Sequence, residues 1–93
     1  MVSPAIHLSV VIPAYNERAR IGATLDAFLA YLDAQPYDWE LIVVDDGSSD
    51  GTADFVDENY ATAKVVRVRP NKGKGHAVKA GMLAARGAYR LFS

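Results

Sequence analysis

The sequence has no cysteine, which excludes a disulfide and a thiolate metal site. It has no strong charge of one sign, because 10 Lys and Arg against 11 Asp and Glu leave a net charge of −1. Nucleic acid and anionic membranes are therefore not expected partners. No apolar run approaches the roughly 20 residues of a membrane span, and the N-terminal residues MVSPAIHLSV lack the pattern of a signal peptide. These absences predict a soluble, cytoplasmic chain.

What is present fits one small globular domain. The chain has 93 residues, of which 51% are hydrophobic and 23% are charged. A chain of this size buries only about 60 to 70% of its unfolded surface, so the expected core is thin.

Segments rich in β-branched and apolar residues predict strands at residues 8–13, 40–45, 64–69 and 88–93. The first two do not alternate between apolar and polar residues, which is typical of strands buried on both faces of a parallel sheet. The third alternates more, so we expect it nearer to an edge of the sheet.

Apolar residues between these strands recur at helical spacing. We expect the first helix to begin at Asn16-Glu17 and to end before Pro36. The second begins with Ser49 or Asp50 as its N-cap, and the third ends near Gly87. The expected apolar stripes are Ile21, Leu25, Phe28, Leu29 and Leu32 in the first helix, Ala53, Val56 and Tyr60 in the second, and Val78, Gly81, Met82 and Ala85 in the third.

The resulting order, β-α-β-α-β-α-β, predicts an α/β fold with a parallel sheet and helices on both faces. Ligands of such sheets bind beyond the carboxyl ends of the strands. Polar clusters follow the first three predicted strands: PAYNE at 13–17, DDGSSDG at 45–51 and PNKGKG at 70–75. We expect the three clusters to lie on one rim of the sheet.

The cluster DDGSSDG allows three interpretations. A capping turn explains Asp50 but not the adjacent Asp45 and Asp46. A calcium loop counted from Asp46 has acids and Gly at suitable positions, yet Asp57 replaces the expected Glu and a strand precedes the loop. In the third interpretation, the carboxylates accept hydrogen bonds from the base or sugar of a ligand.

The other two clusters are also ambiguous when each is taken alone. Lys72, Lys74 and Lys79 surround glycines at a helix start, which favours phosphate, although a solvated basic loop is the simpler interpretation. Tyr15 offers an aromatic face, whereas capping alone accounts for Asn16 and Glu17. Taken together, the clusters describe a pocket for a nucleotide and its phosphates.

Three stretches resemble family 2 glycosyltransferases, which are inverting enzymes with a GT-A fold: VVIPAYNE, LIVVDDGSSDGT and NKGKGHAVKAGMLAARGAYRLFS. The third most resembles enzymes that transfer glucose or mannose to dolichyl or polyprenyl phosphate. The resemblance covers nearly all of residues 8–93 and less than half of a complete catalytic domain. It implies the three-layer, Rossmann-like half of a GT-A fold. It also implies transfer of a hexose from a nucleotide-diphospho-sugar, of the UDP-glucose or GDP-mannose type, to an acceptor such as a polyprenyl phosphate.

The resemblance also implies a nucleotide-binding site and the part of each residue in it. Asp46 would bond to the base or ribose with Asp45 beside it, and Val44 would offer backbone contacts. Lys74 would lie near the base or diphosphate. The complete implied set is Pro13, Tyr15, Glu17, Val44, Asp45, Asp46 and Lys74, with no catalytic residue and no metal ligand among them.

In the family, the strand equivalent to YRLFS runs into an Asp-x-Asp that holds Mg²⁺ or Mn²⁺ against the diphosphate, whereas this sequence stops at Ser93. Residues 1–93 are therefore expected to be the N-terminal nucleotide-sugar-binding portion of a catalytic domain, inactive alone. An unpaired last strand predicts a homodimer or larger assembly. A stand-alone nucleotide-binding or regulatory module and a ligand-free α/β oligomer stay open as alternatives. Membrane association of a longer parent protein also stays open.

Overall fold

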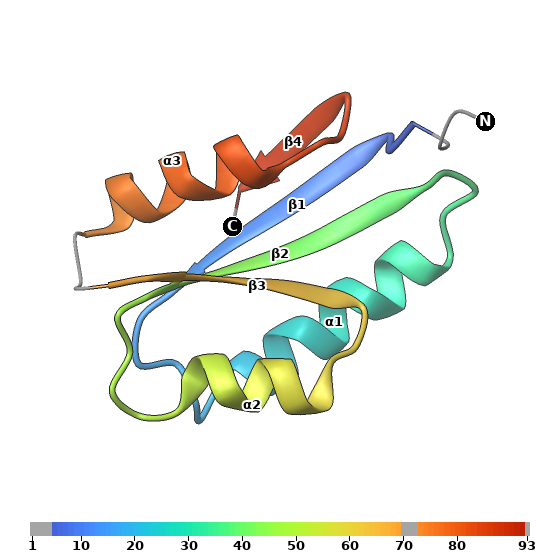
Figure 1. Cartoon of the computed structure of the whole chain (residues 1–93). Helices are drawn as coiled ribbons and strands as arrows, with labels where there is room; N and C mark the ends of the chain where they lie inside the picture. The colour runs from blue at the N-terminus through green and yellow to red at the C-terminus, as the bar shows by residue number, and fades with distance from the viewer. Residues whose placement is uncertain (1–4, 70–72, 93) are drawn as a thin grey trace.

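The computed structural model describes residues 5–69 and 73–92, without the side chains of Lys74 and Phe92. Strands and helices alternate along this part of the chain in the predicted order (Figure 1). The elements are β1 (Leu8–Ala14), α1 (Ile21–Asp33), β2 (Trp39–Asp46), α2 (Thr52–Asn59), β3 (Ala63–Val68), α3 (Lys74–Ala84) and β4 (Tyr89–Phe92).

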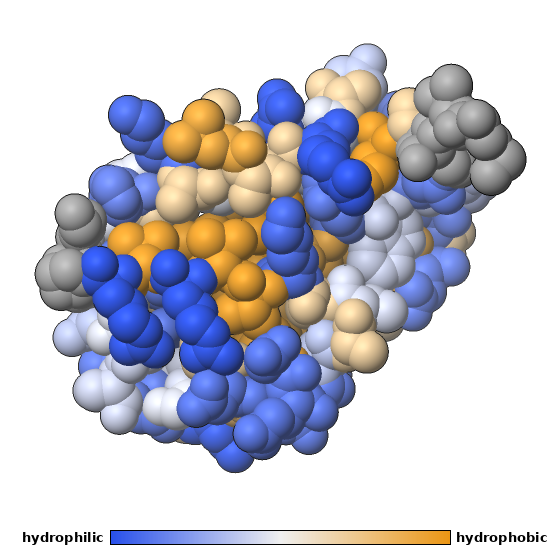
Figure 2. Space-filling model, viewed as in Figure 1, coloured by the Kyte–Doolittle hydropathy of each residue, from blue (hydrophilic) through white to orange (hydrophobic). Residues whose placement is uncertain are grey.

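The strands form one parallel sheet in the order β3-β2-β1-β4. Its register places Ile12 of β1 beside Val43 of β2, which lies beside Val65 of β3. The predicted edge position of the third strand is confirmed, and its Val65 and Val66 are only half-buried. Figure 2 shows hydrophobic side chains on this open side of the molecule, between α3 and α2.

Helices cover both faces of the sheet, with α1 and α2 on one side and α3 on the other (Figure 1). Side chains alternate along each strand, so Val10 and Ile12 pack in the cluster that contains Leu25 and Leu32 of α1. Val11, between them, packs in the second cluster with α3. The predicted three-layer α/β arrangement is confirmed.

Helix α1 begins at Ile21, with Arg20 as its N-cap, and not at Asn16-Glu17 as predicted. Asn16 has a left-handed backbone, with φ of 52°, so it is not itself part of a right-handed helix. The Glu17 carbonyl accepts hydrogen bonds from the backbone N–H groups of Arg20 and Ile21, so a separate turn precedes the helix. The predicted end before Pro36 is confirmed.

Helix α2 also begins later than predicted. Its N-cap is Gly51, which has φ of 84°, and not Ser49 or Asp50. Asp50 lies one position earlier, where its Oδ1 still accepts the N–H of Thr52 at 3.1 Å. The left-handed glycine turns the chain into the helix, and this conformation is costly for other residues.

The predicted stripe of α3 is wrong at Met82, which is 46% exposed. The side of α3 that meets the sheet is made of small residues, with Ala77 and Gly81 buried. A Cβ atom at Gly81 would lie 2.2 Å from Cγ1 of Val11 and 3.0 Å from Cγ2 of Val44. The helix approaches the sheet so closely that the larger Met82 side chain faces outward.

Side-chain hydrogen bonds fasten the connection between α3 and β4 at the amino end of the sheet. Ser9 Oγ donates to Glu40 Oε2 at 2.5 Å and accepts the Gly87 N–H at 2.8 Å. The Arg86 N–H donates to the same Glu40 oxygen at 2.6 Å. This pair of side chains from β1 and β2 thereby fixes where β4 enters the sheet.

None of the described helices is long and apolar enough to cross a membrane.

Candidate functional site

The polar clusters that follow β1 and β2 meet at the carboxyl edge of the sheet. Because neighbouring parallel strands end at the same edge, residues 15–20 and 47–51 lie side by side there. The third cluster reaches the same place through Gly73, whose N–H donates to Asp46 Oδ2 at 2.9 Å. The expected convergence is therefore present for the described residues, while Pro70, Asn71 and Lys72 lie outside them.

Asp45 and Asp46 are both buried, yet their side chains point in different directions. Adjacent residues of a strand point to opposite faces, and the two carboxylates have different partners. Asp45 Oδ2 accepts the N–H of Ser48 at 3.2 Å, whereas Asp46 accepts the N–H of Gly73. Each carboxylate therefore orders a different loop, which reduces the repulsion expected between adjacent acids.

The second oxygen of Asp45, Oδ1, is buried and accepts no hydrogen bond from the described residues. A buried polar atom without a partner is costly, so this position favours a hydrogen-bond donor. Asp45 thus has one oxygen that accepts a hydrogen bond from the chain and one buried oxygen that has no partner among the described residues.

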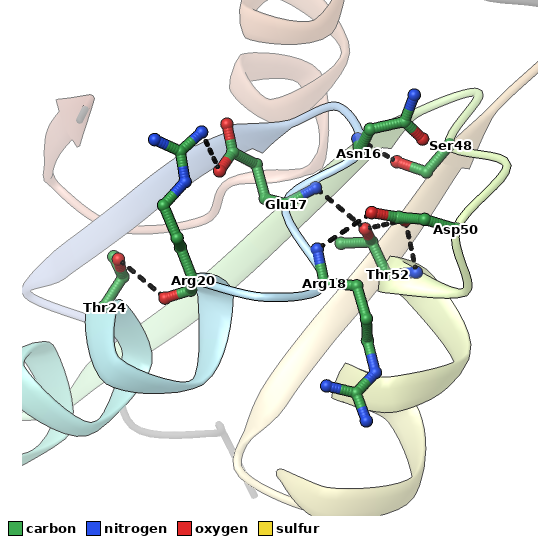
Figure 3. Close-up of polar contacts among 8 residues, drawn as sticks. All are labelled: Asn16, Glu17, Arg18, Arg20, Thr24, Ser48, Asp50 and Thr52. Carbon is green, nitrogen blue, oxygen red and sulfur yellow. Dashed lines mark hydrogen bonds and ion pairs between the residues drawn. The ribbon is translucent and has the colours of Figure 1, made fainter.

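The residues predicted from the first cluster surround the end of β1. Tyr15 is 51% exposed, so its aromatic face is accessible to a ligand. Glu17 is half-buried and pairs with Arg20 at 2.7 Å (Figure 3). Pro13 and Glu17 line a hollow of about 270 Å³ whose other lining residues are Ile12, Arg20, Ile21 and Thr24.

The remaining predicted residues belong to β2 and α3. The side chain of Val44 is fully buried against α3, so it is not available to a ligand, and the backbone contact of Val44 stays a prediction. Lys74 is the first residue of α3, and its side chain lies outside the described atoms. The bond between Gly73 and Asp46 places this helix start beside the end of β2.

A set of hydrogen bonds joins the first loop, residues 15–20, to the second loop, residues 47–51, and to Thr52 at the start of α2, and the sequence pattern did not reveal it. The backbone N–H groups of Asn16, Glu17 and Arg18 donate to Ser48 Oγ at 2.8 Å, Thr52 Oγ1 at 3.0 Å and Asp50 Oδ2 at 3.0 Å (Figure 3). In return, the Ser49 N–H donates to Asn16 Oδ1 at 2.9 Å. These partners are 32 to 35 residues apart, so no local periodicity could pair them.

The same contacts alter the acidity of Asp50. The hydrogen bond from the Thr52 hydroxyl lowers the pKa of the Asp50 carboxyl, and the N–H groups of Arg18 and Thr52 act in the same direction, partly opposed by desolvation. Hydrogen bonds to a carboxylate favour its charged form. Asp50 therefore accepts its hydrogen bonds as an anion at neutral pH.

Comparison with known proteins identifies the family. Residues 9–93 match glycosyl transferase family 2. The chain belongs to this family. The predicted resemblance is therefore confirmed.

The relatives of this family 2 chain include a dolichyl-phosphate beta-glucosyltransferase of Drosophila melanogaster, which is 40% identical over 101 residues. That match covers 98% of the chain and 31% of the relative, so the chain spans about a third of the relative's length.

Solved structures agree with the fold. S. aureus TarS 1-349 in complex with UDP superposes with a TM-score of 0.80 at 29% identity, over 95% of this chain and 27% of that one. The mannosyltransferase PcManGT from Pyrobaculum calidifontis, in complex with GDP-Man and Mn²⁺, has a TM-score of 0.69 at 29% identity, over 90% of this chain and 27% of that one. The predicted Rossmann-like part of a GT-A fold is confirmed.

The described residues contain no group of three or more His, Cys, Asp or Glu side chains that could hold a metal ion. Asp45 and Asp46 face opposite sides of the sheet, so they cannot jointly chelate one ion. The calcium-loop interpretation also fails, because the segment before Asp46 is the strand β2 and an EF-hand requires a helix there.

Proposed function

We propose that residues 1–93 form the nucleotide-sugar-binding portion of a glycosyltransferase catalytic domain. The whole enzyme would transfer a hexose from a nucleotide-diphospho-sugar, of the UDP-glucose or GDP-mannose type, to a polyprenyl phosphate. The observation that carries this proposal is the meeting of the polar loops after β1, β2 and β3 at one edge of the sheet, around the buried Asp45 and Asp46. Ligands of parallel sheets bind at this edge.

Asp46 would accept a hydrogen bond from the base or ribose. Asp45 would accept a further donor at Oδ1, which has no partner among the described residues. Val44 would contribute only its backbone, since its side chain is buried.

Residues at the end of β1 and the start of α3 would complete the pocket. The exposed ring of Tyr15 can stack on a base, an arrangement that tolerates different bases. Pro13 and Glu17 would line the pocket through the hollow that they share. Lys74, at the N-terminus of α3, would favour the diphosphate by its charge and by the helix dipole.

The names of the relatives and similar structures support the proposed donor and acceptor substrates. One relative is a dolichyl-phosphate beta-glucosyltransferase, and two similar structures hold UDP or GDP-Man. A polyprenyl phosphate acceptor is a lipid, so the whole enzyme would work at a membrane surface. The donor would reach it from the cytoplasm.

Mg²⁺ or Mn²⁺ would stabilise the departing diphosphate in the whole enzyme. The described residues do not fit such an ion, because they provide no cluster of ligands and their paired carboxylates diverge. The proposed contribution of this chain is therefore to bind and orient the nucleotide.

An amide NMR titration of the chain with UDP-glucose, GDP-mannose and ATP, with and without Mg²⁺, tests the proposal. We expect shifts at Tyr15, Val44 and Asp46 with the nucleotide sugars, changed little by the metal. A folded sample without shifts for any nucleotide would contradict donor binding by this chain and favour a non-catalytic α/β module.

We further propose that the 93-residue chain forms homodimers at the β4 edge. Tyr89 and Leu91 of β4 are 64% and 49% exposed, and an open edge strand can pair with another chain. Beside β4 lies an apolar hollow of about 350 Å³, lined by Leu8, Val10, Ala27, Phe28, Tyr31, Leu32 and Leu91.

Light scattering at increasing concentration should show a dimer that Leu91→Lys disrupts. Leu83→Lys on α3 serves as the matched control, because Leu83 is 80% exposed and lies on a different element. A monomer at every concentration would contradict the homodimer.

A further inference from the structure

Side chains from residues 48–52 accept hydrogen bonds from consecutive backbone N–H groups of the first loop. Three consecutive backbone N–H groups, of Asn16, Glu17 and Arg18, each donate to a side-chain oxygen of residues 48–52 (Figure 3). A backbone N–H group outside a helix or strand needs another partner, which can be a side chain or water. Here the second loop and Thr52, the first residue of α2, supply an acceptor for every one of them, so the path of the first loop depends on these side chains.

Asn16 makes this dependence reciprocal. Its N–H donates to Ser48 Oγ while its side-chain oxygen accepts the Ser49 N–H, so the residue bonds to the second loop in both directions. Its φ of 52° lies in the left-handed region, which asparagine tolerates better than most residues. The left-handed Asn16 therefore turns the chain sharply between Tyr15 and Glu17.

Thr52 is the buried centre of the connection. It is 0% exposed, and its hydroxyl accepts the Glu17 N–H while donating to Asp50 Oδ1. The other oxygen of Asp50 accepts the Arg18 N–H at 3.0 Å. The guanidinium of Arg18 then lies 3.8 Å from the ring centroid of Phe55 in α2.

Capping of α2 does not explain these contacts. The N-cap of α2 is Gly51, and of these contacts only the bond from the Thr52 N–H to Asp50 Oδ1 serves a backbone donor of the helix. The second Asp50 oxygen and the Thr52 hydroxyl are directed instead to the backbone of the first loop, in the segment that carries Tyr15 and Glu17.

We propose that Asn16, Asp50 and Thr52 are positioning residues of the nucleotide site, which hold Tyr15 and Glu17 in place relative to Asp46. They act through the backbone of the first loop and do not themselves contact the ligand. This inference rests on the proposed nucleotide-binding function.

The test uses the 93-residue chain and Thr52→Val, which removes the hydroxyl but keeps the shape of the buried side chain. Thr52→Ser restores the hydroxyl and serves as the rescue variant, and Asp50→Ala removes the neighbouring acceptor. Asp54→Asn is the matched control, because Asp54 lies in the first turn of the same helix but pairs with Arg67 at 3.0 Å. Amide hydrogen exchange at Glu17 and Arg18 and the Kd for UDP-glucose and GDP-mannose are measured for each variant.

We expect slow exchange at Glu17 and Arg18 in the unaltered chain, and fast exchange in Thr52→Val and Asp50→Ala with the rest of the fold unchanged. Losing one well-placed hydrogen bond to the loop should raise the Kd about tenfold. Thr52→Ser should restore both properties, and Asp54→Asn should alter neither.

Two results would overturn the inference, and they differ from each other. If the unaltered chain binds a nucleotide sugar and Thr52→Val binds it equally well, these residues do not position the site, although the proposed function stands. If the unaltered chain binds no nucleotide, the proposed function fails and the positioning role fails with it, whatever the exchange rates show.

Discussion

The face of the sheet that meets α1 and α2 is filled by large side chains, including the fully buried Leu25 and Leu32. The opposite face meets α3 through Ala77, Gly81 and Ala85. The first face gains its stability from the area of large apolar side chains. The second gains it from close approach of a helix backbone to the sheet, because a Cβ at Gly81 would already overlap Val11.

The faces also differ at the carboxyl edge. The loops that lead into α1 and α2 are joined by bonds from backbone N–H groups to side chains of residues 48–52. The start of α3 is joined to the sheet through Gly73 and Asp46. The face packed by large side chains thus has, at its carboxyl edge, a bonded rim, which is the set of hydrogen bonds between residues 16–18 and residues 48–52. It is also the side on which we propose that side chains position the nucleotide site.

The largest expected effect is on the first face. Leu25→Ala should lower the free energy of unfolding by about 2 to 5 kcal/mol, because it removes a fully buried side chain and leaves a cavity. A domain of this size is stable by only about 5 to 15 kcal/mol. Urea unfolding measures the loss. Leu83→Ala is the control, since an 80% exposed leucine should change stability by less than about 0.5 kcal/mol. Equal losses of unfolding free energy in the two variants would contradict the expected effect of burial.

On the opposite face, Gly81→Ala should cost about 1 to 3 kcal/mol, because the added methyl group overlaps Val11 and forces α3 away from the sheet. Gly75→Ala in the same helix is the control. It has no atom within 4 Å of the added Cβ and gains helix propensity, so it should be neutral or stabilising. Thermal unfolding of both variants checks this, and a stabilising Gly81→Ala would refute the close approach of α3.

At the amino edge, Ser9→Ala should lower the free energy of unfolding by about 1 to 3 kcal/mol. It leaves the buried Gly87 N–H without its acceptor and removes the donor to Glu40. Hydrogen exchange should become faster at Gly87 while Ser48 in the second loop stays unchanged. Unaltered exchange at Gly87 would mean that β4 is held mainly by strand pairing.

The smallest effect concerns the bonded rim. The pKa of Asp50 is lowered by its hydrogen bonds, chiefly that from Thr52, so its stabilising contribution is complete above the ordinary value of about 3.9 and is lost as the pH falls through the lowered pKa. Exchange protection at Arg18 should therefore persist down to about pH 4 and weaken below it. Asp50→Asn should remove this dependence on pH. A loss of protection that begins near neutral pH would implicate another group.

The order of the elements, the parallel sheet and the edge position of β3 were predictable, because they follow from the periodicity of nearby residues. The divergence of Asp45 and Asp46 could also have been predicted, since strand residues alternate in direction. The beginning of α1 could not. It depends on the left-handed Asn16, which is stabilised by bonds to Ser48 and Ser49, far away in the sequence.

The sequence by itself determined the succession of strands and helices, because this depends on local apolar patterns. It thereby also determined that the polar loops lie at one edge of a parallel sheet, because this depends on the direction of the strands. Only the tertiary structure decided that Met82 faces outward and that the side chains of Asp50 and Thr52 bind the backbone of the first loop. The physical reason is that these features depend on distances between segments more than 30 residues apart, such as the 32 residues between Arg18 and Asp50.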